Sequence, residues 1–264
     1  MTHVDAELKQ PGVLWLTLNR PEKHNAFNDD MIQEIISHLD SAESNPEVKV
    51  LVFASAGKSF SAGADVQWMK SMKTASYEEN IFDALQLATL LYRLNHFSKP
   101  TICRVQGAAF GGAVGLVSCC DMSVAVAHAS FSLSEVKIGM IPATISPYVV
   151  RAMGERNARR FFQTGEQFSA ERASAMRLLH EVVDDDVAMD KQISDWVCAL
   201  VANGPDAMSE SKRLIADVVA RPLNEEIVRT TSEWIAKIRI SPEGQEGLSA
   251  FLEKRPPDWS QALK

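Results

Sequence analysis

The segment TICRVQGAAFGGAVGLVSCCD, residues 101–121, joins a short apolar strand to an apolar helix through a turn rich in glycine. Gly111, Gly112 and Gly115 stand where the helix is expected to begin, although glycine inside a helix costs about 1 kcal/mol relative to alanine. Bare backbone at a helix N-terminus leaves N–H groups open, and with the helix dipole these can hold a negative oxygen. Close packing of the helix on a sheet would explain the same glycines, so this segment alone leaves both interpretations open.

A second turn of small residues follows another apolar segment. The stretch KSFSAGADVQWM, residues 58–69, comes after the predicted buried strand VKVLVFAS, residues 48–55, and its smallest residues surround Gly63. N–H groups from two such turns are suited to hold one oxygen that becomes negative during a reaction. Loss of a single donor of this kind typically costs about 2.7–4 kcal/mol of transition-state stabilisation. The two turns together therefore indicate an enzyme with an oxyanion hole.

A carboxyl group follows the next predicted strand. Glu135 in FSLSEVKIGMIP, residues 131–142, has mostly apolar neighbours. Burial among them disfavours the charged form and raises the pKa of a carboxyl towards neutrality, which suits a general acid or base. An exposed glutamate, or one paired with Lys137, fits the same pattern equally well.

Strands and helices alternate through the first two thirds of the chain, which predicts an α/β fold. The expected strands lie within residues 12–20, 48–55, 100–107, 121–129 and 129–135, and a helix is expected at 29–43. Beyond about residue 190 only helical periodicity remains, and the last helix is expected to end before Pro256 and Pro257. We therefore predict a core at residues 1–190 and a helical C-terminal region at residues 191–264.

Composition narrows the class of partner. The 264 residues carry a formal net charge of −7, which disfavours nucleic acid and anionic membranes, since both require a basic surface. Four cysteines without a Cys-x-x-Cys pair or a histidine at ligand spacing predict free thiols in a reducing compartment and no metal site. An N-terminus without an apolar leader, and the absence of any run of eighteen apolar residues, predict a cytoplasmic protein.

Six segments, taken in order, resemble the crotonase superfamily of enoyl-CoA hydratases and isomerases over nearly the whole chain. They are LNRPEKHNAFN (18–28), FSAGAD (60–65), VQGAAFGGAVGL (105–116), CCDMSVA (119–125), FSLSEVKIGMIP (131–142) and EGLSAFLEKR (246–255). The resemblance implies a ClpP-like spiral of ββα turns with a helical C-terminal trimerisation region, assembled as a homotrimer or a dimer of trimers. It also implies an acyl-CoA thioester substrate, with coenzyme A as part of the substrate and with no metal or redox cofactor.

The resemblance also assigns site residues. The thioester oxygen would accept hydrogen bonds from the N–H groups of Ala64 and Gly112, and Glu135 would be the acid/base. The substrate pocket would include Gly111, Gly115, Ser134, Trp68, Ile141, Pro142 and Tyr148, although core packing explains Trp68 equally well. Coenzyme A would be held by Lys23, Asn25, Ala26, Phe27, Ala62, Gly63 and Asp65, and by Phe251 and Lys254, often across a subunit boundary, although each lysine is equally consistent with a solvated surface charge.

One departure from the family pattern bears on the reaction. Hydratases of this family commonly use two glutamates, and the position of the first is occupied here by Gly115. The chain looks most like bacterial 3-methylglutaconyl-CoA hydratases of leucine breakdown and isohexenylglutaconyl-CoA hydratases of acyclic terpene breakdown. Both substrates carry a distal carboxylate, which we expect to help hold the attacking water. Candidate partners for this substrate carboxylate are Tyr148, Lys137 and Ser134. A Δ3,Δ2-enoyl-CoA isomerase with one glutamate and a non-catalytic acyl-CoA-binding protein are the alternatives.

Overall fold

A mixed, mainly parallel sheet organises the protein. The computed structural model describes residues 2–261 and contains a six-stranded sheet of order β1-β2-β3-β4-β6-β9. β1 pairs antiparallel with β2, and the other neighbours pair parallel. The strands are β1 (Val4–Lys9), β2 (Val13–Leu18), β3 (Val50–Ser55), β4 (Thr101–Val105), β6 (Met122–Val126) and β9 (Glu181–Val183). The predicted α/β class is confirmed.

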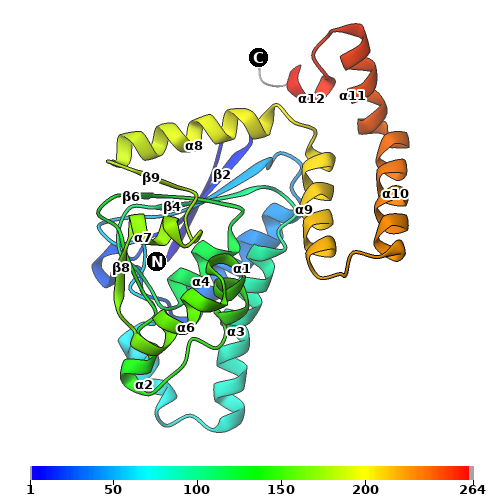
Figure 1. The fold of residues 1–264 in the computed structure, drawn as a ribbon. Coiled ribbons are helices and arrows are strands. Elements are labelled where there is room, and N and C mark those ends of the chain that lie inside the picture. The colour runs from blue at the N-terminus through cyan, green and yellow to red at the C-terminus, as the bar shows by residue number, and fades with distance from the viewer. Residues whose placement is uncertain (1, 262–264) are drawn as a thin grey trace.

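Helices cover both faces of this sheet (Figure 1). α8 (Asp186–Val201) lies on one face, where it contacts β3, β4, β6 and β9. On the other face α1 (Asp29–Ser44) packs against α3 (Tyr77–Asn95), and α3 packs against α4 (Gly112–Cys119). Every residue of β3 is buried, as expected for a parallel strand covered on both sides. The remaining helices of the body are α2 (Val66–Met72), α5 (Ser146–Met153), α6 (Glu155–Thr164) and α7 (Ala170–Ala175).

A smaller sheet lies beyond the carboxyl ends of β4 and β6. Its order is β5-β7-β8, with β5 (Ala109–Phe110) parallel to β7 (Ser130–Ser132), and β7 antiparallel to β8 (Gln167–Ser169). β5 leads directly into α4, and β7 is followed by a 3-10 turn at Glu135–Ile138. This small sheet therefore brings the glycine-rich turn next to the segment that carries Glu135.

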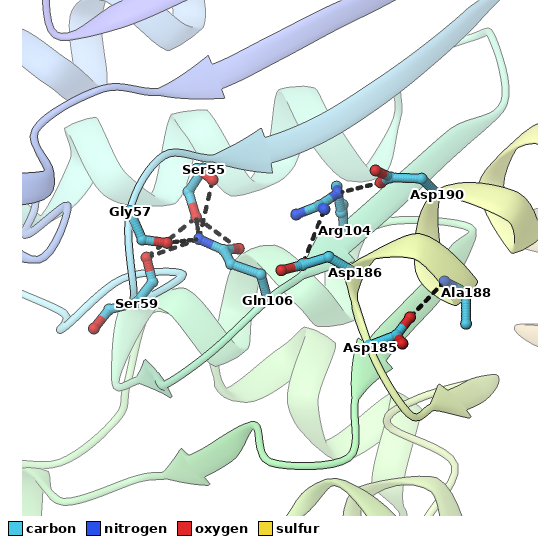
Figure 2. A network of polar contacts seen from close by, with 9 residues as sticks. All are labelled: Ser55, Gly57, Ser59, Arg104, Gln106, Asp185, Asp186, Ala188 and Asp190. Carbon is cyan, nitrogen blue, oxygen red and sulfur yellow. Dashed lines mark hydrogen bonds and ion pairs between the residues drawn. The ribbon is translucent and has the colours of Figure 1, made fainter.

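The C-terminal part is helical, as predicted, and comprises α9 (Pro205–Val219), α10 (Glu225–Ile240), α11 (Pro242–Glu253) and α12 (Asp258–Gln261). α10 and α11 extend away from the body (Figure 1). The predicted division at residues 190 and 191 falls inside α8, which belongs with the sheet. Arg104 on β4 pairs with Asp190 at 2.7 Å and with Asp186 at 3.0 Å, both on α8 (Figure 2). No helix within residues 2–261 is long and apolar enough to cross a membrane.

Candidate active site

Backbone hydrogen bonds join the two small-residue turns. Phe27 donates its N–H to the Gly63 carbonyl at 2.7 Å, and Asp65 donates its own to the Phe27 carbonyl at 2.8 Å. Two residues before Gly63, the Ser61 N–H donates to the Ala108 carbonyl, and the Phe110 N–H donates to the Ser61 carbonyl, both at 3.0 Å. The turn at residues 61–65 is therefore fixed between the loop before α1 and the strand that leads into α4.

The two turns approach each other so closely that glycine is required. Gly63 has a φ of +89°, and a Cβ atom there would lie 3.0 Å from the Phe110 carbonyl oxygen. A side chain at Gly63 would thus contact the backbone of Phe110, and the left-handed φ would be strained for any residue other than glycine. Within the described chain, the N–H groups of Ala64 and Gly112 donate to no protein acceptor. Two open N–H groups, one from each turn, are what an oxyanion hole needs.

Glu135 reaches back to the start of α4. Gly111, with a φ of +56°, donates its N–H to the Ser132 carbonyl at 2.9 Å, and a Cβ atom at Gly111 would lie 3.1 Å from Glu135 Oε1. The carboxyl group therefore lies directly over the glycine that precedes Gly112. Sequence reasoning placed Glu135 just after a short strand, and β7 ends at Ser132.

The surroundings of Glu135 are suited to proton transfer. Burial raises the pKa of its carboxyl above the ordinary value of 4.5. Its Oε2 atom is buried and has no hydrogen-bond partner anywhere in residues 2–261. A carboxyl with an open, buried oxygen and a raised pKa holds its proton to higher pH than an exposed carboxyl, which suits it to pass that proton to a bound molecule.

The next turn of α4 is closed by apolar side chains. Gly115 lies three residues beyond Gly112, on the same side of α4. A Cβ atom at Gly115 would lie 2.4 Å from Ile145 Cγ2, 2.9 Å from Ile145 Cβ and 3.2 Å from Leu91 Cδ2. Ile145 is 1% exposed and Leu91 is fully buried. The place beside Glu135 where a second carboxylate would stand is thus filled by hydrocarbon.

The predicted coenzyme A residues fall into two groups. Lys23 and Ala62 are exposed, whereas Asn25, Ala26 and Phe27 are buried. The Asn25 amide donates to the carbonyls of Ala56 and Ser59 at 2.7 and 2.9 Å, and its oxygen accepts from Arg20 N–H at 2.8 Å. The Asn25 side chain therefore holds the loop together, and the predicted contact of Asn25 with coenzyme A stays a prediction.

A cleft of about 350 Å³ lies beside these residues. It is lined by Arg20, Lys23, Asn28, Asp29, Asp30, Asp65, Gln67, Trp68 and Ser71. Trp68, one of the predicted pocket residues, lies in this cleft and donates from its indole N–H to Asp83 at 2.7 Å. Asp65 uses its carboxylate to cap α2, accepting from Gln67 N–H at 2.7 Å, and its backbone carbonyl accepts from Met69 N–H at 2.9 Å; its predicted contact with the nucleotide stays a prediction.

The remaining predicted pocket residues are dispersed. Ser134 directly precedes Glu135, Pro142 is buried, and Ile141 is exposed. Tyr148 is half-buried on α5, the helix that packs against α4, and burial raises the pKa of its hydroxyl. Its place in the substrate pocket stays a prediction.

Phe251 and Lys254 lie at the end of α11. Phe251 is 79% exposed, and Lys254 terminates the helix in the left-handed conformation. In Figure 1, α11 stands well away from α2, whose residues Gln67, Trp68 and Ser71 line the cleft. Within one chain these two residues do not reach the site.

Two polar side chains that sequence reasoning missed hold the site together. Gln106 directly follows β4, and its amide nitrogen donates to the carbonyls of Ser55, Gly57 and Ser59 at 3.0–3.1 Å (Figure 2). Arg20 pairs with Asp65 at 3.0 Å. The only sequence signals were a glutamine directly before Gly107 and an arginine directly before Pro21, and neither indicates a contact with a distant turn.

Comparisons with known proteins agree with this geometry. The sequence matches the Enoyl-CoA hydratase/isomerase family over residues 8–262. An enoyl-CoA hydratase structure from Shewanella pealeana ATCC 700345 has a TM-score of 0.94 and 45% identity, covering 97% of this chain and 96% of that one. The mevalonyl-coenzyme A hydratase of Aspergillus fumigatus is 32% identical over 251 residues, 94% of this chain and 92% of that protein. An enoyl-CoA hydratase of Mycobacterium tuberculosis is 31% identical over 263 residues, 97% of this chain and 96% of that protein.

The chain belongs to the enoyl-CoA hydratase/isomerase family and has the crotonase fold. Enoyl-CoA hydratase-type activity on acyl-CoA thioesters follows from this membership.

Proposed function

We propose that the protein adds water reversibly to an α,β-unsaturated acyl-CoA of the glutaconyl type. The first candidate is 3-methylglutaconyl-CoA, which would give 3-hydroxy-3-methylglutaryl-CoA in leucine degradation; the second is isohexenylglutaconyl-CoA of acyclic terpene degradation. One observation carries the proposal. Glu135 is a half-buried carboxyl whose buried Oε2 has no partner among the described residues, it lies over the glycine that precedes Gly112, and Ile145 fills the space at Gly115. A substrate that supplies its own acid fits such a site.

In the proposed mechanism, the thioester oxygen accepts hydrogen bonds from the N–H groups of Ala64 and Gly112. These donors stabilise the enolate that forms when a water oxygen bonds to C3. The neutral carboxyl form of Glu135, which burial favours by raising its pKa, gives its proton to C2 and regains one from the added water. One water molecule is consumed, and the carboxyl returns to its starting state. No metal or redox cofactor takes part in this scheme.

The distal carboxylate of the substrate completes the proposed site. Ile145 and Leu91 are hydrocarbon and cannot orient a water molecule. A carboxylate two carbons beyond C3 can accept a hydrogen bond from the water that attacks C3. The Aspergillus relative is named for mevalonyl-coenzyme A, whose acyl chain also branches at C3 and carries a polar group at its end. That likeness supports a branched, polar acyl group here.

The test is the ratio of kcat/KM for 3-methylglutaconyl-CoA to that for crotonyl-CoA, measured on one preparation by loss of the conjugated enoyl thioester. We expect a preference of at least a hundredfold for the glutaconyl substrate. A preference for crotonyl-CoA would contradict the proposal, because that substrate has no carboxylate to orient the water.

A Δ3,Δ2-enoyl-CoA isomerase is the second candidate. The packing of Ile145 against Gly115 favours it, since moving a proton between two carbons needs one base and no bound water. A 3-enoyl-CoA converted to its conjugated isomer faster than any 2-enoyl-CoA is hydrated would identify this activity.

The proposal includes a second copy of the chain. Lys23 and the exposed backbone at Ala62 would contact coenzyme A from one chain. Phe251 and Lys254 would come from a neighbour in a cytoplasmic homotrimer or dimer of trimers, because α11 stands away from α2 (Figure 1), which lines the cleft of its own chain. Light scattering at micromolar concentration tests the assembly, and a monomer that retains full activity would contradict it.

A further inference from the structure

A buried ion pair lies behind the Ala64 turn. Arg20 Nη2 donates to Asp65 Oδ2 at 3.0 Å, and the two side chains are only 13% and 9% exposed. The same guanidinium donates from Nη1 to the Ala26 carbonyl at 2.8 Å. Arg20 therefore holds one group on each side of the backbone bridge between Phe27 and Ala64.

The direction of the Ala64 N–H depends on that bridge. In a planar trans peptide the C=O and N–H point in opposite directions. The carbonyl of the Gly63–Ala64 peptide accepts from Phe27 N–H at 2.7 Å, so the Ala64 N–H must point away from Phe27. A rotation of this peptide, or a shift of Phe27, would turn the Ala64 N–H away from an acceptor placed between it and Gly112.

Arg20 also orders the loop that carries Phe27. Its own N–H donates to Asn25 Oδ1 at 2.8 Å, and its carbonyl accepts from Asn25 N–H at 2.9 Å. On the other side, Asp65 accepts from Gln67 N–H and so fixes the start of α2. A planar guanidinium with several donors can bridge two acceptors at once, whereas a lysine ammonium on a flexible stem does so less well.

We propose that Arg20 is a positioning residue for the reaction: by bridging Ala26 and Asp65 it sets the direction of the Ala64 N–H in the oxyanion hole. This inference rests on the proposed function, because it requires Ala64 to be a donor to the thioester oxygen. Arg20 also lines the cleft beside Lys23, and a direct contact with the phosphates of coenzyme A is the competing role that the experiment must separate.

The test compares Arg20→Lys with the parent enzyme. Lysine keeps the positive charge and removes the planar bridge. We expect kcat to fall roughly tenfold to a hundredfold, since an error of about 1 Å in placing a reacting group costs about a hundredfold. The Kd of free coenzyme A, measured by calorimetry, should change less than twofold. An unchanged kcat would overturn the proposal. An unchanged kcat with weaker coenzyme A binding would identify Arg20 as a phosphate ligand instead.

Two further variants keep the result interpretable. Asp65→Asn retains a helix-capping side chain and weakens the pair. We expect the double variant, Arg20→Lys with Asp65→Asn, to have a kcat only slightly lower than that of Arg20→Lys alone. If the fold-losses of the two single variants multiply in the double variant, Arg20 and Asp65 do not share one role. If Arg20→Lys does not fold, Asp65→Asn alone should still lower kcat with coenzyme A binding unchanged, and a normal kcat would overturn the proposal.

Matched controls separate this inference from the proposed function. Arg93 and Asp40 form a similar pair at 2.9 Å, but their side chains are 51% and 45% exposed, so Arg93→Lys should change neither measurement. Glu135→Gln provides the other control. If Glu135→Gln is fully active, the proposed function fails. If Glu135→Gln is inactive while Arg20→Lys has a normal kcat, only the positioning role fails.

Discussion

The substitution Gly115→Ala has two opposing effects on the free energy of unfolding: a gain in helix propensity and a steric clash in the core. Gly115 lies inside α4, and its φ is outside the left-handed region, so alanine should stabilise the helix by about 1 kcal/mol at an unhindered site. At this site, however, the new methyl group would lie 2.4 Å from Ile145 Cγ2 and 3.2 Å from Leu91 Cδ2. Both neighbours are buried, so neither can move into solvent.

The clash is the larger effect. Forcing a methyl group into a filled core typically costs about 1–3 kcal/mol. Subtracting the helix gain leaves a net destabilisation of up to about 2 kcal/mol by these same magnitudes. Ile145→Ala alone should cost about 2–5 kcal/mol. The double variant should be more stable than the sum of the single losses predicts, because the added methyl group occupies part of the space that Ile145 leaves.

Urea unfolding at one fixed protein concentration measures these differences. Gly112→Ala is the control on the same helix, since a Cβ atom there would meet Phe27 and Leu87 at ordinary contact distances of 3.6–3.7 Å, and we expect no loss of stability. If Gly115→Ala is more stable than the parent protein, the space beside Glu135 is open, and the argument that packing excludes a second carboxylate is refuted.

Three further predictions concern acidic side chains. Glu135→Gln should lower kcat at least a hundredfold in the enoyl thioester assay; near-normal turnover would contradict its role. Burial raises the pKa of Glu135 from 4.5, so its stabilising contribution is complete below about pH 4.5 and is lost as pH rises through the higher folded value. The free energy of unfolding of the parent protein should therefore fall relative to that of Glu135→Gln as the pH rises above about 4.5. If the two proteins show the same dependence of unfolding free energy on pH, the pKa of Glu135 is not raised. Arg255 and Asp258 N–H lower the pKa of Glu246 to about 2, so Glu246→Gln should speed hydrogen exchange at residues 255–258 at pH 7, with a smaller difference at pH 3.

The elements with the clearest periodicity could be predicted from sequence. β3 is apolar throughout, and α1 shows a 3.6-residue apolar pattern after its capping residue Asn28. β1 was not predicted, because VDAELK has charged residues at alternate positions and only Val4 is buried. Its place at the sheet edge is set by pairing with β2, which is a long-range property.

The same distinction explains what could be predicted of the site. Gly111 and Glu135 follow the short strands β5 and β7, and Gly63 lies in the turn after β3, where local pattern marks a turn. Ile145 was not predicted to fill the place at Gly115, because the contact joins residues thirty positions apart. Tyr148 was assigned to the pocket from its nearness to Pro142 in the sequence, and that assignment stays a prediction, because sequence distance alone does not show which side chains line a pocket.

We propose that a single carboxyl, Glu135, transfers the protons needed to add water to the substrate. It is tested most directly by incubating the enzyme with 3-methylglutaconyl-CoA in water labelled with both deuterium and ¹⁸O, and analysing the product by mass spectrometry. We predict that the hydrated product carries one solvent ¹⁸O at C3 and one deuterium at C2, and that neither label is incorporated with Glu135→Gln. Deuterium without ¹⁸O, in a product whose double bond has moved, would contradict hydration and identify an isomerase.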